Sequence, residues 1–183
     1  MRRLERRFFA DTRVWVCGRA VGDTLEIAVG TGLNLPNYGP DVHLTALDRD
    51  ADMLALAVSR ANTLGLDVVA TTGDALTLPF PDATFDSVVC TFAMCEVADI
   101  DRALAECARI LRPGGRLLLA DHVVATTRPV RWGQRALESV TIPLAGEHFT
   151  RRPLDHLATA GLTLVESDRL AHGVIERVHA RKE

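Results

Sequence analysis

Short runs of strand-forming residues alternate with helical patterns along most of this chain, and that alternation constrains the fold more than any other feature. Strands are predicted over residues 24–29, 43–47, 67–72, 85–91 and 116–123. Between them, apolar residues at helical spacing predict helices over 51–64 and 100–111. Strands and helices in this order are typical of a mainly parallel sheet with helices on both faces.

The last third of the chain follows a different pattern. Residues 131–140 and 154–160 are predicted to form helices, and residues 162–168 and 174–180 two strands that pair as an antiparallel hairpin. With the five earlier strands, the hairpin predicts an α/β fold of Rossmann-like type, a seven-stranded and mostly parallel sheet with an antiparallel last strand. The length of 183 residues, without a linker-like stretch, suits a single domain.

Candidates for a ligand site stand where the predicted strands end, because an open parallel sheet binds ligands beyond the carboxyl ends of its strands. The loop 30–34, Gly-Thr-Gly-Leu-Asn, lets backbone N–H groups approach a ligand without obstruction by Cβ atoms. Asp48 ends the second strand, where a carboxylate can accept hydrogen bonds from both ribose hydroxyls of a nucleoside. Asp74 follows Gly73 after the third strand and is expected within reach of an adenine amino group. Each aspartate alone is typical of a turn or a cap, but together these features predict a nucleoside-containing cofactor.

A dinucleotide such as NAD is the natural competitor for this site. Its fingerprint needs a third glycine where this chain has Leu35, and Pro36 follows immediately. A bulky side chain there hinders close packing of helix on strand, and the stretch 32–43 is too short for a long first helix. NAD therefore stays a minor alternative.

Charge and hydropathy limit the partners. The formal net charge is −3, so the protein as a whole does not attract nucleic acid, and no apolar run approaches the roughly 18 residues that span a bilayer. The basic and apolar stretch 1–22 is interrupted by Asp11, Arg13 and Arg19 and lacks a small-residue cleavage site, which argues against a signal peptide. Two interpretations of it stay open, a helix that covers the domain edge and a basic surface that makes weak peripheral contact with anionic lipid.

The four cysteines are Cys17, Cys90, Cys95 and Cys107. They fit neither a secreted disulfide scaffold nor a zinc motif, because no paired histidines accompany them in the sequence. We interpret them as buried free thiols in a reducing cytoplasm and expect no metal.

Four stretches resemble consecutive motifs of class I methyltransferases, which use S-adenosylmethionine and release S-adenosylhomocysteine. They are TLEIAVGTGLNLPNY, ALDRDADML, TTGDALTLPFPDATFDSVVCTFAMCEVAD and ECARILRPGGRLLLADH. The resemblance covers about 25–123 and lies within the methyltransferase type 11 group, which includes the ubiquinone/menaquinone C-methyltransferases. It implies the same seven-stranded sheet and divides the chain into a helical cover (1–22), a cofactor-binding core (23–123) and acceptor-side helices with the terminal hairpin (124–183).

The resemblance also assigns residues to parts of the cofactor. These are Glu26, Gly30 and Gly32 around the methionyl part, Asp48 at the ribose with Arg49 and Met53 flanking it, Asp74 and Ala75 at the adenine, and Thr91 and Phe92 beneath the sulfonium end, with Thr31, Asn34 and Gly73 in the same loops. One departure is Ala28, where the loop of the family opens with glycine. Alanine is small, so we expect it to adjust affinity without abolishing binding.

The acceptor of the methyl group is expected to be a small molecule, either a thiol, an amine or a phenol or quinol. The stretches VVCTFAMCEV, RPGGRLLLADHV and FTRRPLDHLATAGL most resemble small methyltransferase-like proteins that methylate alkyl thiols, and some relatives are known as phosphatidylethanolamine N-methyltransferases. A general base is needed only where the acceptor arrives protonated. Glu96, His122 and His148 are weak candidates, each as typical of a structural or solvated side chain, so no catalytic residue is assigned.

Two other functions compete with small-molecule methyl transfer. The lack of an obvious base suggests a non-catalytic module that binds S-adenosylmethionine. A nucleic-acid or protein methyltransferase is the third hypothesis, but 90–93 reads Cys-Thr-Phe-Ala, without the Asn/Asp-Pro-Pro-aromatic element that holds a flipped base. We expect a cytoplasmic enzyme that is a monomer or a homodimer and binds no nucleic acid.

Overall fold

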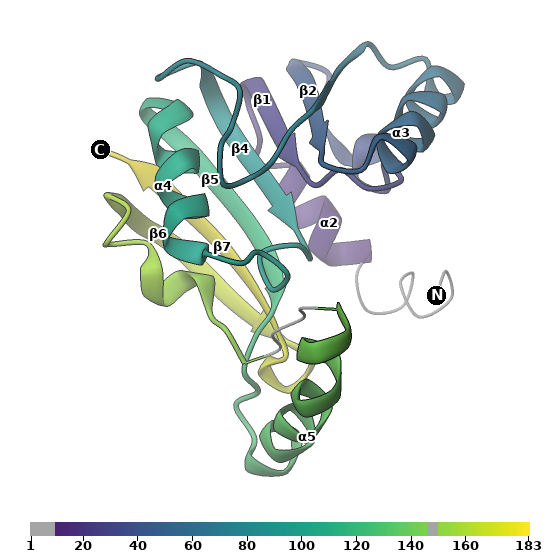
Figure 1. The fold of residues 1–183 in the computed structure, drawn as a ribbon. Helices are drawn as coiled ribbons and strands as arrows, with labels where there is room; N and C mark the ends of the chain where they lie inside the picture. The colour runs from purple at the N-terminus through teal and green to yellow at the C-terminus, as the bar shows by residue number, and fades with distance from the viewer. Residues whose placement is uncertain (1–9, 146–149) are drawn as a thin grey trace.

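The computed structural model describes residues 10–145 and 150–183. Its strands are β1 (Gly22–Ile27), β2 (Val42–Asp48), β3 (Val68–Thr72), β4 (Phe85–Thr91), β5 (Leu111–His122), β6 (Leu162–Leu170) and β7 (Ile175–Lys182). They form one sheet in the order β3-β2-β1-β4-β5-β7-β6 (Figure 1). The pairs from β3 to β5 are parallel, and β7 runs antiparallel to both of its neighbours. The predicted seven-stranded sheet with an antiparallel last strand is confirmed.

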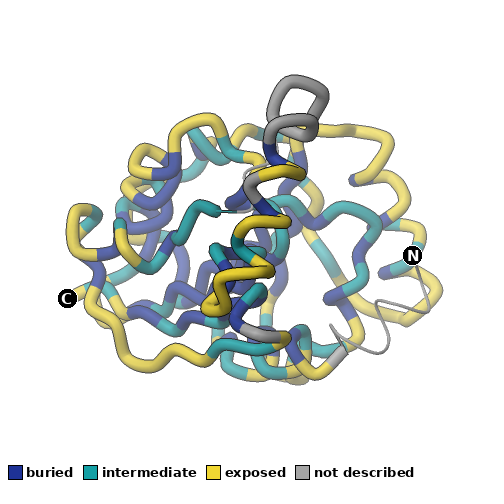
Figure 2. Tube along the Cα trace, turned by 90° about the horizontal axis from the view of Figure 1, so that it is seen from below, coloured by how far each residue is buried: buried dark blue, intermediate teal, exposed yellow. Residues whose placement is uncertain are grey.

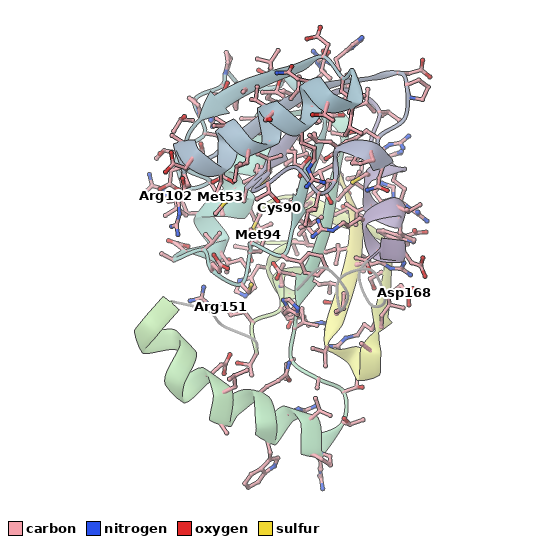
Figure 3. All side chains as sticks on the ribbon, turned by 90° about the vertical axis from the view of Figure 1, so that its right-hand side faces the viewer. Met53, Cys90, Met94, Arg102, Arg151 and Asp168 are labelled. Carbon is pink, nitrogen blue, oxygen red and sulfur yellow. The ribbon has the colours of Figure 1, made fainter. Side chains whose placement is uncertain are left out.

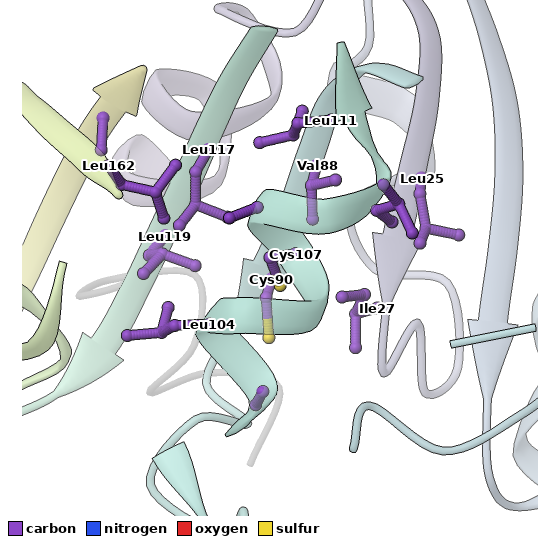
Figure 4. Packing of buried hydrophobic residues seen from close by; sticks show 14 of the residues in the cluster. Leu25, Ile27, Val88, Cys90, Leu104, Cys107, Leu111, Leu117, Leu119 and Leu162 are labelled. Carbon is purple, nitrogen blue, oxygen red and sulfur yellow. The ribbon is translucent and has the colours of Figure 1, made fainter. Parts of the chain in front are cut away.

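Helices cover both faces of this sheet, as predicted. Side chains of β4 alternate between the faces. Cys90 packs in the core cluster with Leu104 and Cys107 of α4 (Ile100–Ile110), as Figure 4 shows. Val89, on the opposite face, packs with Val16 of α2 (Ala10–Cys17). Helix α3 (Ala51–Leu64) covers the same face as α2, over β2 and β3.

Helix ends follow the expected local chemistry. The side chain of Asp50 caps α3 by accepting hydrogen bonds from the N–H groups of Asp52 and Met53. Gly65 ends this helix in the left-handed conformation, at a φ of 68°, and the helix keeps the predicted bounds 51–64. Asp99 caps α4 through the N–H of Arg102. These caps fix where α3 and α4 begin, and therefore where the preceding loops meet the sheet edge.

The region after β5 departs from the prediction. A helix α5 (Arg128–Ala145) extends the one expected over 131–140 and lies beyond the carboxyl ends of the strands (Figure 1). Its described side chains between 128 and 138 are mostly exposed (Figure 2), in contrast to the central strands β1, β4 and β5, and Trp132 is 76% exposed. No helix among the described residues is long and apolar enough to cross a membrane.

The helix predicted over 154–160 is wrong. A single 3-10 turn (Pro153–His156) takes its place, followed by turns up to Gly161, which has a φ of 73°. The N–H of Leu162 bonds back to the carbonyl of Leu157, so this segment closes into a compact turn before β6. Backbone N–H groups in this segment bond to carbonyls three residues earlier, as Leu157 does to Leu154 and Gly161 to Ala158, so the chain forms successive tight turns in place of an α-helix.

Smaller shifts occur at two other places. β1 begins and ends two residues before the predicted 24–29, because the chain turns at Ala28, where φ is 55°. β5 begins at Leu111, before the predicted 116–123, and its pairing with β4 is irregular up to Arg116. In the N-terminal stretch, α2 forms within the predicted cover of 1–22, and residues 1–9 lie outside the described residues.

Candidate functional site

The loop after β1 turns tightly enough to need glycine. Ala28, Gly30 and Gly32 have φ values of 55°, 53° and 72°, a region that favours glycine over other residues. At Gly32 a Cβ atom would lie 2.7 Å from the Leu35 side chain and 3.2 Å from the backbone of Ala57 in α3. The left-handed turn therefore favours glycine at both positions, and the close approach of α3 requires it at Gly32.

Asp48 holds this loop against the start of α3. Its side chain is buried at the end of β2, where one oxygen accepts the N–H of Gly30 at 2.7 Å and the other that of Asp50 at 3.0 Å. Each carboxylate oxygen retains a further lone pair for a ligand. Arg49 and Met53 are exposed beside it. The structure thus brings Asp48 and the glycine loop together, as the sequence predicts.

Glu26 lies beneath the loop in a buried hydrogen-bond network. Its carboxylate accepts the Asn34 Nδ2–H at 2.8 Å and the Tyr38 hydroxyl at 2.8 Å, and Asn34 also donates to Thr91 Oγ1 at 2.9 Å. Burial raises the pKa of Glu26 to about 7, although the hydrogen bonds from Tyr38 and Asn34 act in the opposite direction. The network joins three predicted site residues from β1, its loop and the end of β4.

Arg13 of α2 belongs to this network, and the sequence analysis missed it. Its Nη1 donates to Asn34 Oδ1 at 2.7 Å and to Thr91 Oγ1 at 3.3 Å. The guanidinium carbon lies 5.3 Å from the centre of the Phe92 ring, in cation–π range. In the sequence, the only indication of this role was that Arg13 is a basic residue in a short helix whose inner side is apolar at Val16. That signal predicts burial of one face and does not show which strand end the side chain reaches.

The end of β3 carries the predicted Gly73-Asp74-Ala75 segment. The N–H of Gly73 donates to the carbonyl of Asp48 at 3.0 Å, which places the segment beside the end of β2. Asp74 is exposed, and its carboxylate accepts the N–H of Leu76 at 2.8 Å in a local turn. Asp74 therefore acts as a turn residue and at the same time presents a carboxylate at the predicted edge.

The ends of β4 and β5 form the opposite side of the site. Phe92 follows β4 with a φ of 57°, and its ring lies 5.2 Å from that of His122. Asp121 is buried, and its carboxylate accepts the N–H groups of His122 at 2.8 Å and of Cys95 at 3.0 Å. Burial raises the pKa of Asp121 to about 7. Of the weak base candidates, His122 thus lies beside Phe92, Glu96 is exposed on the loop, and His148 lies outside the described residues.

Side chains from three segments lie between α3 and α5 in the view of Figure 3. Figure 3 shows Met53 of α3, Met94 after β4 and Arg151 in succession toward α5. Arg151 donates to the carbonyl of Val97, which fixes it to the loop after β4. Thiols are buried throughout the described part of the chain, including Cys90 and Cys95.

These donors suit a nucleoside with hydroxyl and amino groups. Glu26 and Asp48 place two carboxylates at the ends of β1 and β2, both almost wholly buried. Carboxylates accept hydrogen bonds from ribose hydroxyls or an ammonium group, whereas they repel a pyrophosphate. The site therefore fits S-adenosylmethionine and disfavours the NAD alternative.

The sheet order, the reversed β7 and the carboxylates at the strand ends define the class I methyltransferase fold. Residues 25–119 match the family model described as a methyltransferase domain. The chain belongs to this family, whose cofactor is S-adenosylmethionine.

Curated relatives carry different acceptors in their names. A phosphatidylethanolamine N-methyltransferase from Cereibacter sphaeroides is 38% identical over 63% of this chain and 58% of its own length. A demethylmenaquinone methyltransferase from Deinococcus radiodurans is 42% identical over 53% of this chain and 42% of its own. The chain thus spans about half of the length of the curated relatives that it matches.

Solved structures share the fold at low identity. A geranyl diphosphate methyltransferase in complex with GPP and sinefungin superposes on this chain with a TM-score of 0.77. It is 20% identical, and the match covers 99% of this chain and 78% of that protein. At this identity the likeness shows the fold alone.

Proposed function

We propose that this protein transfers the methyl group of S-adenosylmethionine to a small-molecule acceptor at the carboxyl edge of β1, β2 and β4. The observation that carries the proposal is the Asp48 carboxylate. It binds the loop N–H of Gly30 and retains lone pairs at the strand end where the ribose of a nucleoside cofactor is bound.

Each strand end supports one part of the cofactor. Gly30, Thr31 and Gly32 would hold the methionyl part, and the network of Glu26 and Asn34 lies directly beneath them. Asp48 would hold the ribose, and Asp74 with Ala75 the adenine. Thr91 and Phe92 would then lie beneath the sulfonium, because they follow β4, the neighbour of β1.

The chemistry is an in-line displacement, for which the bound cofactor supplies an electrophilic methyl group on a good leaving group. The residues of this chain contribute position and a partly dry surface. Phe92 and the buried Met94 provide apolar contact, and the half-buried His122 lies beside Phe92 on the acceptor side of the site.

The acceptor class is a small molecule with a thiol, amine or quinol nucleophile. The names of the relatives support both a lipid amine and a quinone precursor, and the motifs of the sequence favour an alkyl thiol. The net charge of −3 supports a partner other than nucleic acid.

Calorimetry with S-adenosylhomocysteine tests cofactor binding. Asp48→Ala should weaken binding by roughly 100-fold, because charge-assisted hydrogen bonds contribute about 1.5–3 kcal/mol each. Asp52→Ala is the matched control, since Asp52 is exposed in the first turn of α3. Equal affinity of Asp48→Ala and wild type would contradict the proposal.

Product formation then identifies the acceptor. S-adenosylhomocysteine release is measured with alkyl thiols, amines, phenols and quinols as methyl acceptors. We expect turnover with one of these nucleophile classes. Tight binding without turnover across the panel would instead indicate a non-catalytic module.

A further inference from the structure

Three chemically different donor groups gather beside Phe92. They are the thiol of Cys95, the carboxylate of Asp121 and the imidazole of His122, and one ligand atom from each lies within 4.8 Å of the others. Cys95 follows β4, whereas Asp121 and His122 end β5. The parallel pairing of Thr91 with Ala120 brings these two strand ends together, so residues 26 apart in sequence become neighbours.

The carboxylate of Asp121 is held by hydrogen bonds and not by an ion pair with a described Arg or Lys side chain. It accepts backbone N–H groups of Cys95 and His122 and a hydrogen bond from the Cys95 thiol. Among the described residues no Arg or Lys side chain pairs with it, although Glu176, its partner in the sheet, pairs with Arg152. A buried carboxylate beside a thiol is costly unless a positive charge compensates it.

We propose that Cys95, Asp121 and His122 bind a zinc ion and leave its fourth position open to the heteroatom of a thiol acceptor. One sulfur, one oxygen and one nitrogen are the donor types that zinc accepts, and three protein ligands with an open position characterise catalytic zinc. Magnesium and calcium prefer oxygen ligands alone.

Zinc binding requires a small adjustment of the three side chains. Zinc binds sulfur at about 2.3 Å and nitrogen at about 2.0–2.1 Å, so tetrahedral ligand atoms lie roughly 3.5 Å apart. Donor atoms within 4.8 Å reach this spacing by rotation of side chains. The hydrogen bond between the Cys95 thiol and the Asp121 carboxylate already places the sulfur next to an oxygen. The zinc ion would replace the proton of this hydrogen bond.

This inference rests on the proposed methyl transfer and names its acceptor. A thiol loses its proton to solvent when its sulfur binds zinc. The sulfur lone pair then forms the bond to the methyl carbon. The bond between that carbon and the cofactor sulfonium breaks with its electron pair, which gives S-adenosylhomocysteine and a methyl thioether.

The three zinc-binding residues do not form a sequence motif. For that reason the spacing of the cysteines in the sequence did not predict a zinc site. Zinc motifs place paired ligands a few residues apart. Here Asp121 and His122 meet Cys95 only because β4 and β5 are neighbours in the sheet.

Metal binding is tested without any activity measurement. Purified protein is loaded with zinc sulfate, passed through a desalting column and assayed for zinc by atomic emission, and affinities are measured against a chromophoric chelator. Wild type should retain about one zinc per chain. Cys95→Ala and His122→Ala should each weaken binding by more than about 100-fold, beyond the loss typical of outer-shell partners.

Matched controls separate this site from other cysteines and histidines. Cys107→Ala changes a buried thiol of α4, and His43→Ala removes an imidazole whose side chain is 82% exposed. Both should keep the zinc. His122→Ala, at the partly exposed end of β5, keeps the test decisive should Cys95→Ala fail to fold. Zinc that is not retained by wild type, or is retained equally by His122→Ala, overturns the site.

Cobalt reports on the ligands and the open position. Co²⁺ should give a sulfur-to-metal charge-transfer band in wild type that Cys95→Ala lacks, and ethanethiol should shift the band. A band that ethanethiol leaves unchanged overturns the acceptor assignment. S-adenosylhomocysteine calorimetry on the same samples distinguishes the failures, because cofactor binding without zinc overturns only this inference, and zinc without cofactor binding overturns the proposed function.

Discussion

The cofactor side and the C-terminal region of this protein are stabilised in different ways. From β1 to β5, side chains at the strand ends bind backbone groups of neighbouring loops, as Asp48 does with Gly30 and Asp50. After β5, an ion pair from Arg152 to the buried Glu176 ties the turn before β6 to β7. The Asp48 carboxylate keeps lone pairs that a ligand can use. In contrast, both oxygens of the Glu176 carboxylate accept hydrogen bonds from Arg152 inside the fold.

This difference teaches where local sequence carries information. A nucleoside cofactor imposes the same glycines and carboxylates at fixed strand ends. An acceptor pocket has no such shared ligand, so the packing of the C-terminal region depends on side chains far apart in sequence, such as Arg152 and Glu176.

The largest expected effect is on stability in the C-terminal region. Glu176→Gln should lower the free energy of unfolding by about 3 kcal/mol, because the guanidinium groups of Arg152 and Arg169 both lose the buried carboxylate that pairs with them. Urea unfolding measures the change. Glu166→Gln, which breaks the exposed pair with Arg19, should cost less than about 1 kcal/mol. Equal losses in both variants would contradict the contrast drawn between the regions.

The buried Glu26 should make the cofactor side sensitive to pH. Its folded pKa of about 7 lies above the ordinary value of 4.5, and Tyr38, Asn34, Arg13 and Asp48 face it. The folded state therefore holds a proton that the unfolded state loses, and the stability contributed below pH 4.5 is lost as the pH rises through about 7.

Glu26→Gln removes this dependence. At pH 8 the variant should be more stable than wild type by up to about 3 kcal/mol, and the difference should vanish near pH 4. Unfolding curves between pH 4 and 8 measure it. A difference that does not vary with pH would show that Glu26 stays ionised in the folded protein.

Arg13 tests whether α2 contributes to the cofactor site. Arg13→Ala removes the donor to Asn34 and Thr91 and should weaken S-adenosylhomocysteine binding roughly 10-fold, the size of one charge-assisted hydrogen bond. Arg19→Ala is the control, since Arg19 stacks on Trp15 and pairs with Glu166 away from this network. If the two variants bound S-adenosylhomocysteine with equal affinity, the cofactor site would consist of the sheet and its loops without a contribution from α2.

Sequence predicted the sheet and the polar strand ends because both depend on local pattern. Alternating elements predict the seven strands, and Asp48 or Gly32 can be placed from the strand that each follows. Arg13 was missed because its partners, Asn34 and Thr91, come from other elements. The helix predicted over 154–160 failed because apolar spacing does not distinguish an α-helix from the successive turns that the backbone forms there.

The smallest expected effect concerns Ala28, which has a φ of 55° in the loop after β1. A left-handed alanine costs about 1–2 kcal/mol, and the added freedom of glycine in the unfolded chain offsets part of that. Ala28→Gly should therefore stabilise the protein by about 0.5–1 kcal/mol and tighten S-adenosylhomocysteine binding slightly. Ala83, with a φ of 51° in an exposed turn, supplies the control, because Ala83→Gly should bring the same gain in unfolding free energy without any change in cofactor affinity. Equal tightening by both variants would mean that the loop responds to overall stability and that the alanine at 28 has no particular effect on the cofactor.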